Sequence, residues 1–148
     1  MSAVPASATT LGLMFRHIRD AMWSQMEREL QAAGHELTFS QYIVLKRLAT
    51  GMAGVTDLAR AAELNPGAMT RLLDRLEARR LVTRAVDPAD RRAVHITMTP
   101  AGTAMWEAVN HCGQRVRERA MHGLDAAERE QLFALLNRVR DNLTPNGS

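Results

Sequence analysis

Arginine is concentrated in one short segment of this chain of 148 residues. Between Pro66 and Arg92 there are seven arginines and four acids, so the segment carries a net charge of +3. The whole chain also carries +3, so the charges outside the segment cancel. The seven residues are Arg71, Arg75, Arg79, Arg80, Arg84, Arg91 and Arg92. Because the planar guanidinium group forms paired hydrogen bonds with phosphates and with guanine edges, this placement predicts contact with a nucleic acid.

The end of this segment has the pattern of a β-hairpin. In DPADRRAVHITMT, residues 87–99, two acids and two arginines surround a proline, and apolar and polar residues then alternate. The alternation predicts a strand over 94–99, which pairs with a strand over 81–86. The charged residues 87–92 are then expected to form the loop between the two strands.

The charges of this loop suggest two roles. A thin loop that carries Arg91 and Arg92 fits a minor groove or a phosphate backbone, where a helix is too wide. Asp87 and Asp90 are expected to hold the two guanidinium groups through charge-assisted hydrogen bonds. The alternative is a solvated hairpin whose acids and bases simply neutralise each other.

The segment before the hairpin predicts a helix with two different faces. In NPGAMTRLLDRLEARRLV, Asn65 is a favourable N-cap, and Pro66 stands at the first helical position, where its missing N–H costs nothing. One face is apolar and contains Met69, Leu72, Leu73 and Leu76. The opposite face has small and basic residues, namely Gly67, Ala68, Thr70, Arg71 and Arg75. A shorter helix, VTDLARAAEL with Thr56 as its N-cap, comes first, so the two helices and the hairpin predict a winged helix-turn-helix.

Helical spacing of apolar residues continues through the rest of the chain. The helices that we predict there cover 10–33, 38–48, 100–122 and 125–143. The fold class is therefore mostly α, with a small β-hairpin wing. The terminal helices carry apolar stripes that are too long for one small lobe to cover, which predicts an obligate dimer through these helices.

Composition excludes several other classes of protein. The chain is 46% hydrophobic and 24% charged, which is typical of a globular protein rather than a disordered one. It has no apolar run of the roughly 20 residues that cross a membrane, and its first residues do not resemble a secretory signal. A single cysteine, Cys112, fits a reducing compartment, so we expect a cytoplasmic, nucleoid-associated protein. The sequence has no phosphate-binding glycine loop and no nucleophile–base pair, and therefore no sign of an enzyme or of a cofactor.

The segment from LNPGAMTRLLDRLEARRLV to DPADRRAVHITMTPAG resembles the MarR family (multiple antibiotic resistance regulators). The hairpin D-P-x-D-R-R running into ITMTPAG is the most specific part, and the likeness covers residues 10–143. It implies a bacterial transcription regulator, most often a repressor, that binds a pseudo-palindromic operator as a homodimer. The resemblance implies one domain over residues 10–143. Within it, residues 38–99 would form the DNA-binding lobe, and residues 10–33 and 100–143 would form the dimerisation helices. The chain departs from the family at Arg80, where glycine is usual.

The resemblance also implies which residues contact DNA. Arg71 matches the position that reaches base edges in the major groove, and Arg92 matches the wing arginine of the minor groove. Arg91 matches the residue next to the wing arginine, which contacts the DNA backbone. The positions that approach bases or phosphates are Gly67, Ala68 and Thr70, with Arg75 and Thr56 as further phosphate contacts.

Many relatives release DNA when a small aromatic or phenolic compound binds between the dimer helices and the DNA-binding lobe. The resemblance places such a crevice among Phe15, Arg16, Arg19, Trp23, Tyr42 and Trp106. A cation beside apolar surface suggests an aromatic acid or a phenol as the effector. The alternatives are a crevice filled by methionines, a redox signal at Cys112, and a metal signal, although the histidines and acids show no clear ligand spacing. A winged-helix protein-interaction module without sequence-specific DNA binding is a further alternative, which the arginines at 71, 91 and 92 disfavour.

Overall fold

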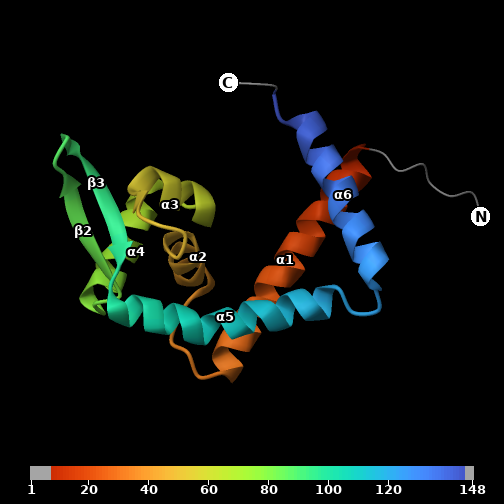
Figure 1. Ribbon diagram of the computed structural model, residues 1–148, viewed down its shortest axis with the longest axis horizontal. Helices are drawn as coiled ribbons and strands as arrows, with labels where there is room; N and C mark the ends of the chain where they lie inside the picture. The colour runs from red at the N-terminus through yellow and green to blue at the C-terminus, as the bar shows by residue number, and fades with distance from the viewer. Residues whose placement is uncertain (1–7, 146–148) are drawn as a thin grey trace, which may run out of the picture. The chain divides into compact units, whose positions relative to one another are not determined.

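The computed structural model describes residues 8–145, which form six helices and three short strands (Figure 1). In chain order these are α1 (Ala8–Ala32), α2 (Phe39–Leu48), β1 (Ala53–Gly54), α3 (Val55–Ala62), α4 (Pro66–Ala78), β2 (Val82–Asp87), β3 (Asp90–Met98), α5 (Pro100–Ala120) and α6 (Ala126–Leu143). All the predicted helices are present, so the mostly helical winged-helix fold class is confirmed. The chain divides into two compact units, with the boundary inside α5 after Val116. In the described range no helix has the length and apolarity needed to span a bilayer.

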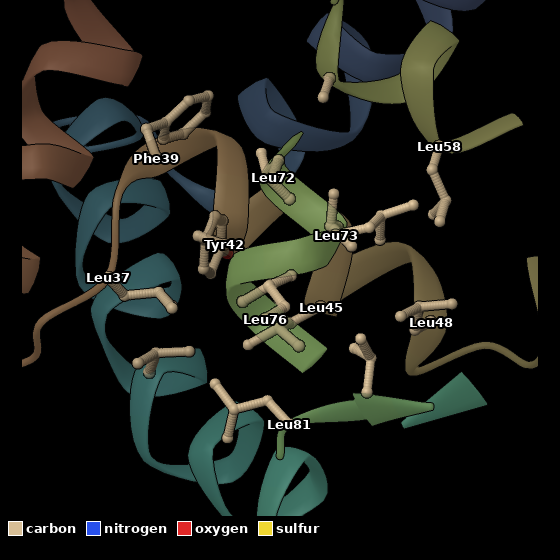
Figure 2. Close-up of a cluster of buried hydrophobic side chains, with 14 of the residues drawn as sticks. Leu37, Phe39, Tyr42, Leu45, Leu48, Leu58, Leu72, Leu73, Leu76 and Leu81 are labelled. Atoms are coloured by element: carbon tan, nitrogen blue, oxygen red, sulfur yellow. The ribbon is translucent and has the colours of Figure 1, made fainter. Parts of the chain in front are cut away.

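The core of the first unit lies where α2, α3 and α4 meet the sheet (Figure 2). The apolar stripe predicted for α4 is buried, and Met69, Leu73 and Leu76 have no exposed surface. Fully burying one such side chain is worth about 1.5–3 kcal/mol, so this stripe fixes the face that α4 turns inward. The opposite face of α4, with its arginines, is thereby left to solvent.

Three antiparallel strands form the wing, in the order β1-β3-β2. Strands β2 and β3 pair from Val82 with Met98 to Val86 with Val94, and a bulge follows at Val86 and Asp87. The predicted loop over 87–92 is therefore too long, because β2 runs to Asp87 and β3 begins at Asp90. Arg91 and Arg92 consequently belong to the start of β3 and not to the turn itself.

The starts of α2, α4, α5 and α6 follow local side-chain chemistry, whereas the start of α3 does not. Thr38 with Gln41 and Asp125 with Glu128 form complete capping boxes, as their spacing predicts. The prediction of Thr56 as the N-cap of α3 is wrong, because that helix begins at Val55. The preceding Gly54 is paired in β1 and is still extended, so the helix starts directly after the strand.

Both terminal helices leave apolar side chains uncovered. On α1, the exposed residues are Leu11, Leu13, Met14, Phe15 and Ile18. In the second unit α6 contains no buried residue, and Phe133, Leu135 and Leu143 are exposed. Apolar surface of this kind is typical of a protein–protein interface, so it supports the predicted dimer.

Candidate nucleic-acid interface

Helix α4 presents a polar face that begins at a well-formed N-terminus. Asn65 accepts a hydrogen bond from the Ala68 N–H at 2.8 Å through its side-chain oxygen, and Pro66 occupies the first helical position. Gly67 is exposed, and Arg71 Nη1 lies 3.9 Å from the point where a Cβ on Gly67 would stand. The guanidinium of Arg71 thus lies along the first turn of the helix, where the backbone is open.

The predicted contact residues of α4 differ in whether their side chains already have partners within the protein. Arg71 and Arg75 are exposed, and neither guanidinium has an ion pair or hydrogen bond to any residue within 8–145. The Thr70 hydroxyl instead donates to the Pro66 carbonyl at 2.9 Å, while Ala68 is half-buried. The free arginines are therefore the groups of this helix that are best suited to bind an anion.

The acids of the wing bind the backbone and not the arginines. Asp87 Oδ1 accepts from the Ala89 N–H at 2.9 Å, and Asp90 Oδ1 accepts from the Arg92 N–H at 3.0 Å. The other oxygen of Asp87 lies 3.1 Å from His95 Nε2. The prediction that these acids hold the arginine side chains is thus wrong, because backbone N–H groups two residues away are closer partners.

This arrangement has an electrostatic consequence. The Ala89 N–H, followed by the His95 ring, lowers the pKa of the Asp87 carboxyl below its ordinary value of 3.8. Arg91 and Arg92 are exposed, and in the described part of the chain neither guanidinium has a partner. The acids shape the tip of the wing, and the two cations remain available.

A compact junction joins the end of α4 to α5. The Thr99 hydroxyl donates to the Arg80 carbonyl at 2.6 Å and accepts from the Gly102 N–H at 3.0 Å. The backbone of Arg80 is left-handed, with φ of 60°. The chain therefore has arginine, where the MarR family usually has glycine, in a conformation that favours glycine. An arginine in this conformation costs on the order of 1 kcal/mol. The Thr99 side chain thus caps the first turn of α5 and at the same time holds the carbonyl of Arg80.

The candidate effector residues form an aromatic row with an arginine at one end. Ring centroids are 4.6 Å apart for Trp23 and Phe39, 6.0 Å for Phe39 and Tyr42, and 5.6 Å for Tyr42 and Trp106. The Arg19 guanidinium carbon lies 5.3 Å from the centroid of Trp23. Three of the predicted aromatic residues therefore lie in one row across α1, α2 and α5, joined by Phe39.

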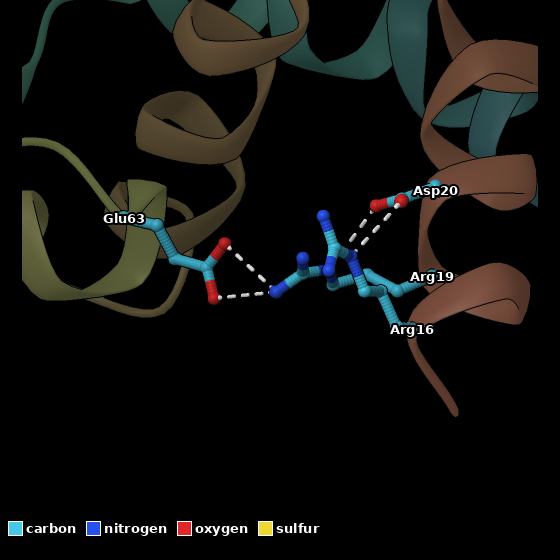
Figure 3. A network of polar contacts seen from close by, with 4 residues as sticks. All are labelled: Arg16, Arg19, Asp20 and Glu63. Carbon is cyan, nitrogen blue, oxygen red and sulfur yellow. Dashed lines mark hydrogen bonds and ion pairs between the residues drawn. The ribbon is translucent and has the colours of Figure 1, made fainter. Parts of the chain in front are cut away.

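The two cations of this region are not equally free (Figure 3). Arg19 Nη1 lies 3.1 and 3.2 Å from the two carboxylate oxygens of Glu63, and Arg16 is 3.9 Å from Asp20. Figure 3 shows the Arg19 side chain extending from α1 toward Glu63, which caps the end of α3. Phe15 is exposed on the same helix. Arg19 Nε also lies 3.5 Å from Asp20 Oδ1, so two internal carboxylates already pair with the cation that the sequence assigns to an acidic ligand.

An open hollow of about 370 Å³ lies beside Trp106. Its walls come from the end of α2, the following loop, β3 and the start of α5, and they include Met52, Met98 and Thr103. Of the predicted effector residues only Trp106 lines this hollow. The hollow and the aromatic row are therefore neighbouring features that share one residue.

Cys112 is buried beside a charged pair. Its Sγ lies 3.3 Å from Arg115 Nη2, and Arg115 Nε donates to Glu29 Oε2 at 2.7 Å. Burial raises the pKa of the Cys112 thiol above its ordinary value of 9.0, against the opposing effect of Arg115. In residues 8–145 no three histidine, cysteine, aspartate or glutamate side chains gather as a metal site would require.

Comparison with known proteins identifies the class to which this arrangement belongs. Residues 35–93 match the model of the MarR family. The chain is 32% identical over 113 residues to the HTH-type transcriptional repressor NicR of Pseudomonas putida, and the match covers 76% of this chain and 72% of NicR. These matches contain α2 to α4 and the wing tip, which are the elements described above.

Two solved structures are similar along nearly the whole chain. A point mutant of MarR from E. coli, complexed with operator DNA, has a TM-score of 0.75 and 26% identity, and covers 93% of this chain and 99% of that one. BpsR of Bordetella bronchiseptica, studied for the regulation of its DNA binding by 6-hydroxynicotinic acid, has a TM-score of 0.74 and 27% identity. That match covers 88% of this chain and 98% of BpsR.

The fold and the arginine-bearing face of α4 define a winged helix-turn-helix protein that binds DNA. The chain belongs to the MarR family. It is accordingly a DNA-binding transcription regulator and not an enzyme.

Proposed function

We propose that this regulator is a repressor, which binds a pseudo-palindromic operator as a homodimer. The observation that carries the proposal is the freedom of Arg71, Arg91 and Arg92, since none of these guanidinium groups has a partner among residues 8–145. Arg71 would read a base edge in the major groove. Arg92 would enter the minor groove, and Arg91 would contact the DNA backbone beside it. The name of NicR as a repressor and the complex of MarR with operator DNA support this assignment.

The remaining predicted contacts would approach bases or phosphates. Gly67 would let the DNA backbone approach the first turn of α4 closely, and Thr56 of α3 and Arg75 of α4 are both exposed. Ala68 and Thr70 lie beside Arg71, although the hydroxyl of Thr70 must leave the Pro66 carbonyl before it can donate to DNA. Contacts to phosphates would position the protein, whereas contacts to bases would specify the sequence.

The homodimer would form through the exposed apolar faces of α1 and α6, together with α5. Two-fold symmetry would then place two α4 helices in successive major grooves, about 34 Å apart. Such a protein would act on chromosomal DNA in the cytoplasm.

The experiment that tests this function is selection of bound sequences from a random DNA pool, followed by measurement of affinity for the selected site. A repressor of this kind should select a site with two inverted half-sites and should bind it as two chains per duplex. Enrichment of no sequence, with equal binding to all DNA, would contradict sequence-specific regulation and favour a protein-interaction module.

We also propose that a small hydroxylated aromatic acid or phenol releases the operator. BpsR is regulated by 6-hydroxynicotinic acid, and the chain offers a row of aromatic rings that includes Trp23, Tyr42 and Trp106, with Arg19 beside Trp23 at one end. The carboxylate of such a ligand would displace Glu63 from Arg19 or bind Arg16, which is held only at 3.9 Å by Asp20, with Phe15 alongside. The Arg19–Glu63 pair is about half exposed and therefore weak, on the order of 1 kcal/mol or less, so a ligand can replace it.

Titration against a labelled operator complex tests the effector. Hydroxynicotinate and salicylate should lower operator affinity in the wild type and should do so less in Arg19→Ala. A ligand that favours the DNA-incompetent dimer by about 3 kcal/mol would lower operator affinity roughly a hundredfold. If neither compound acts at millimolar concentration while an oxidant or a metal ion does, the effector proposal is wrong and a redox or metal signal replaces it.

A further inference from the structure

Arg84 lies in the middle of β2, but its side chain reaches across to α4. Its Nη2 donates to Asp74 Oδ1 at 2.8 Å and lies 3.4 Å from the Thr70 carbonyl oxygen, while Nε is 3.6 Å from Glu77 Oε2. These acceptors are four and three residues apart, so they share one face of the helix. One guanidinium therefore spans about two turns of α4.

Arg84 differs from the other arginines in the basic segment. Within residues 8–145 it is the only one of the seven between Pro66 and Arg92 whose side chain pairs with an acid. Its side chain is 31% exposed, compared with 59% for Asp74 and 47% for Glu77. Arg84 is therefore less exposed than either of the acids that it contacts.

We propose that Arg84 is a positioning residue, which fixes the angle between α4 and the wing and so lets Arg71 and Arg92 engage DNA together. A planar guanidinium that binds several acceptors restricts orientation as well as distance, which a single contact does not. The pair also neutralises Asp74 and Glu77, which would otherwise repel phosphates. This inference rests on the proposed joint contact of α4 and the wing with DNA.

A direct phosphate contact is the competing role, and one substitution separates the two. Asp74→Asn removes a negative charge from α4 and frees the Arg84 guanidinium. If Arg84 binds phosphate, this variant should bind DNA more tightly, on random sequence as well as on the operator. If Arg84 positions the wing, the same variant should bind the operator more weakly, although it carries less negative charge.

Operator affinities of Asp74→Asn, Arg84→Ala and the double variant, measured on the full chain, form the test. We expect each single change to weaken operator binding about tenfold, and the double variant to be no weaker than Arg84→Ala, because both remove the same link. Arg84→Lys keeps the charge but cannot span the acceptors, so its affinity should fall between wild type and Arg84→Ala. Asp141→Asn, which removes a carboxylate of α6 that likewise pairs with an arginine, Arg140, is the matched control and should not weaken binding.

A second readout reports on the wing itself. Arg92→Ala should weaken operator binding in the wild type. It should weaken binding less when Arg84 is already alanine, because Arg92 on a displaced wing no longer reaches the minor groove. Thermal unfolding of each variant checks that the fold persists. Tighter binding by Asp74→Asn, or fully additive losses in both pairs, would overturn the positioning role and leave the proposed function standing. If Arg92→Ala has no effect in the wild type, the proposed wing contact fails, and the role of Arg84 fails with it.

Discussion

The backbone of Gly102, in the first turn of α5, lies directly against the carbonyl group of Leu81 at the start of the wing. A Cβ at position 102 would overlap the Leu81 carbonyl oxygen and stand 3.1 Å from its carbonyl carbon. The Leu81 oxygen also accepts from the Thr99 N–H at 3.1 Å, so it is held where it is. Glycine is required here because the backbone of α5 touches the backbone of Leu81, the residue immediately before β2.

This contact predicts the effect of Gly102→Ala. The added methyl group has to push the α5 backbone away from Leu81, which should lower the free energy of unfolding by about 1–3 kcal/mol. Chemical denaturation measures this loss. Ala101→Ser, which adds one atom to an exposed residue in the same turn, is the control and should change little. Equal stability of Gly102→Ala and wild type would mean that the junction tolerates displacement.

Arg71→Ala tests the reading of bases. We expect operator affinity to fall by about 1–3 kcal/mol and the preference at one base pair in each half-site to relax. The reason is that the free guanidinium lies on the exposed face of α4, opposite the buried Met69 and Leu73. Competition between operator and single-base variants measures the effect. An equal loss on operator and random DNA would assign Arg71 to phosphate.

Arg92→Ala tests the salt dependence of the wing. Removing one cation from the DNA contact should weaken operator binding and reduce the slope of log K against log salt by about 1, because fewer counterions are released. The fold should remain, since Arg92 is exposed and contributes nothing to the core. Arg140→Ala, an exposed arginine of α6 paired with Asp141, is the control and should leave the slope unchanged.

Charge on α6 tests the dimer. Leu136→Asp with Val139→Asp should give aggregated or unfolded protein instead of a stable monomer, because α6 buries no residue within the chain and needs a partner. Asn137→Asp adds a charge to an exposed position of the same helix and should be tolerated. Sedimentation and circular dichroism distinguish the states. A folded monomer from the double variant, or a monomeric wild type at micromolar concentration, would refute the arrangement.

The buried thiol of Cys112 predicts slow alkylation. Because burial raises the pKa of Cys112, a smaller fraction is thiolate at pH 8 than for a free cysteine, and the thiolate is the reactive form. Iodoacetamide should therefore modify the native protein far more slowly than the protein unfolded in urea. Equal rates in the two states would show an accessible, reactive thiol and would favour a redox signal.

The sequence by itself determined the helices of this protein and the face that α4 buries. Periodic apolar residues and local caps, such as Asn65 before Pro66 and Asp125 with Glu128, act within one or two turns, so their effect is visible in the order of residues. The arginine-rich helix and hairpin were predictable for the same reason. The exact strand ends and the short β1 were not, because pairing with a distant strand, as between Ala53 and Ile96, sets them.

Only the tertiary structure decided which charges are free. Asp87 and Asp90 lie beside Arg91 and Arg92 in the sequence, yet they bind backbone N–H groups and a histidine. Two arginines instead bind acids that are distant in sequence: Arg84 binds Asp74, ten residues away, and Arg19 binds Glu63, 44 residues away. An ion pair forms only when the two charged groups lie within a few ångströms of each other. The packing of α1, α3, α4 and β2 sets these distances, and the spacing of the residues in the sequence does not.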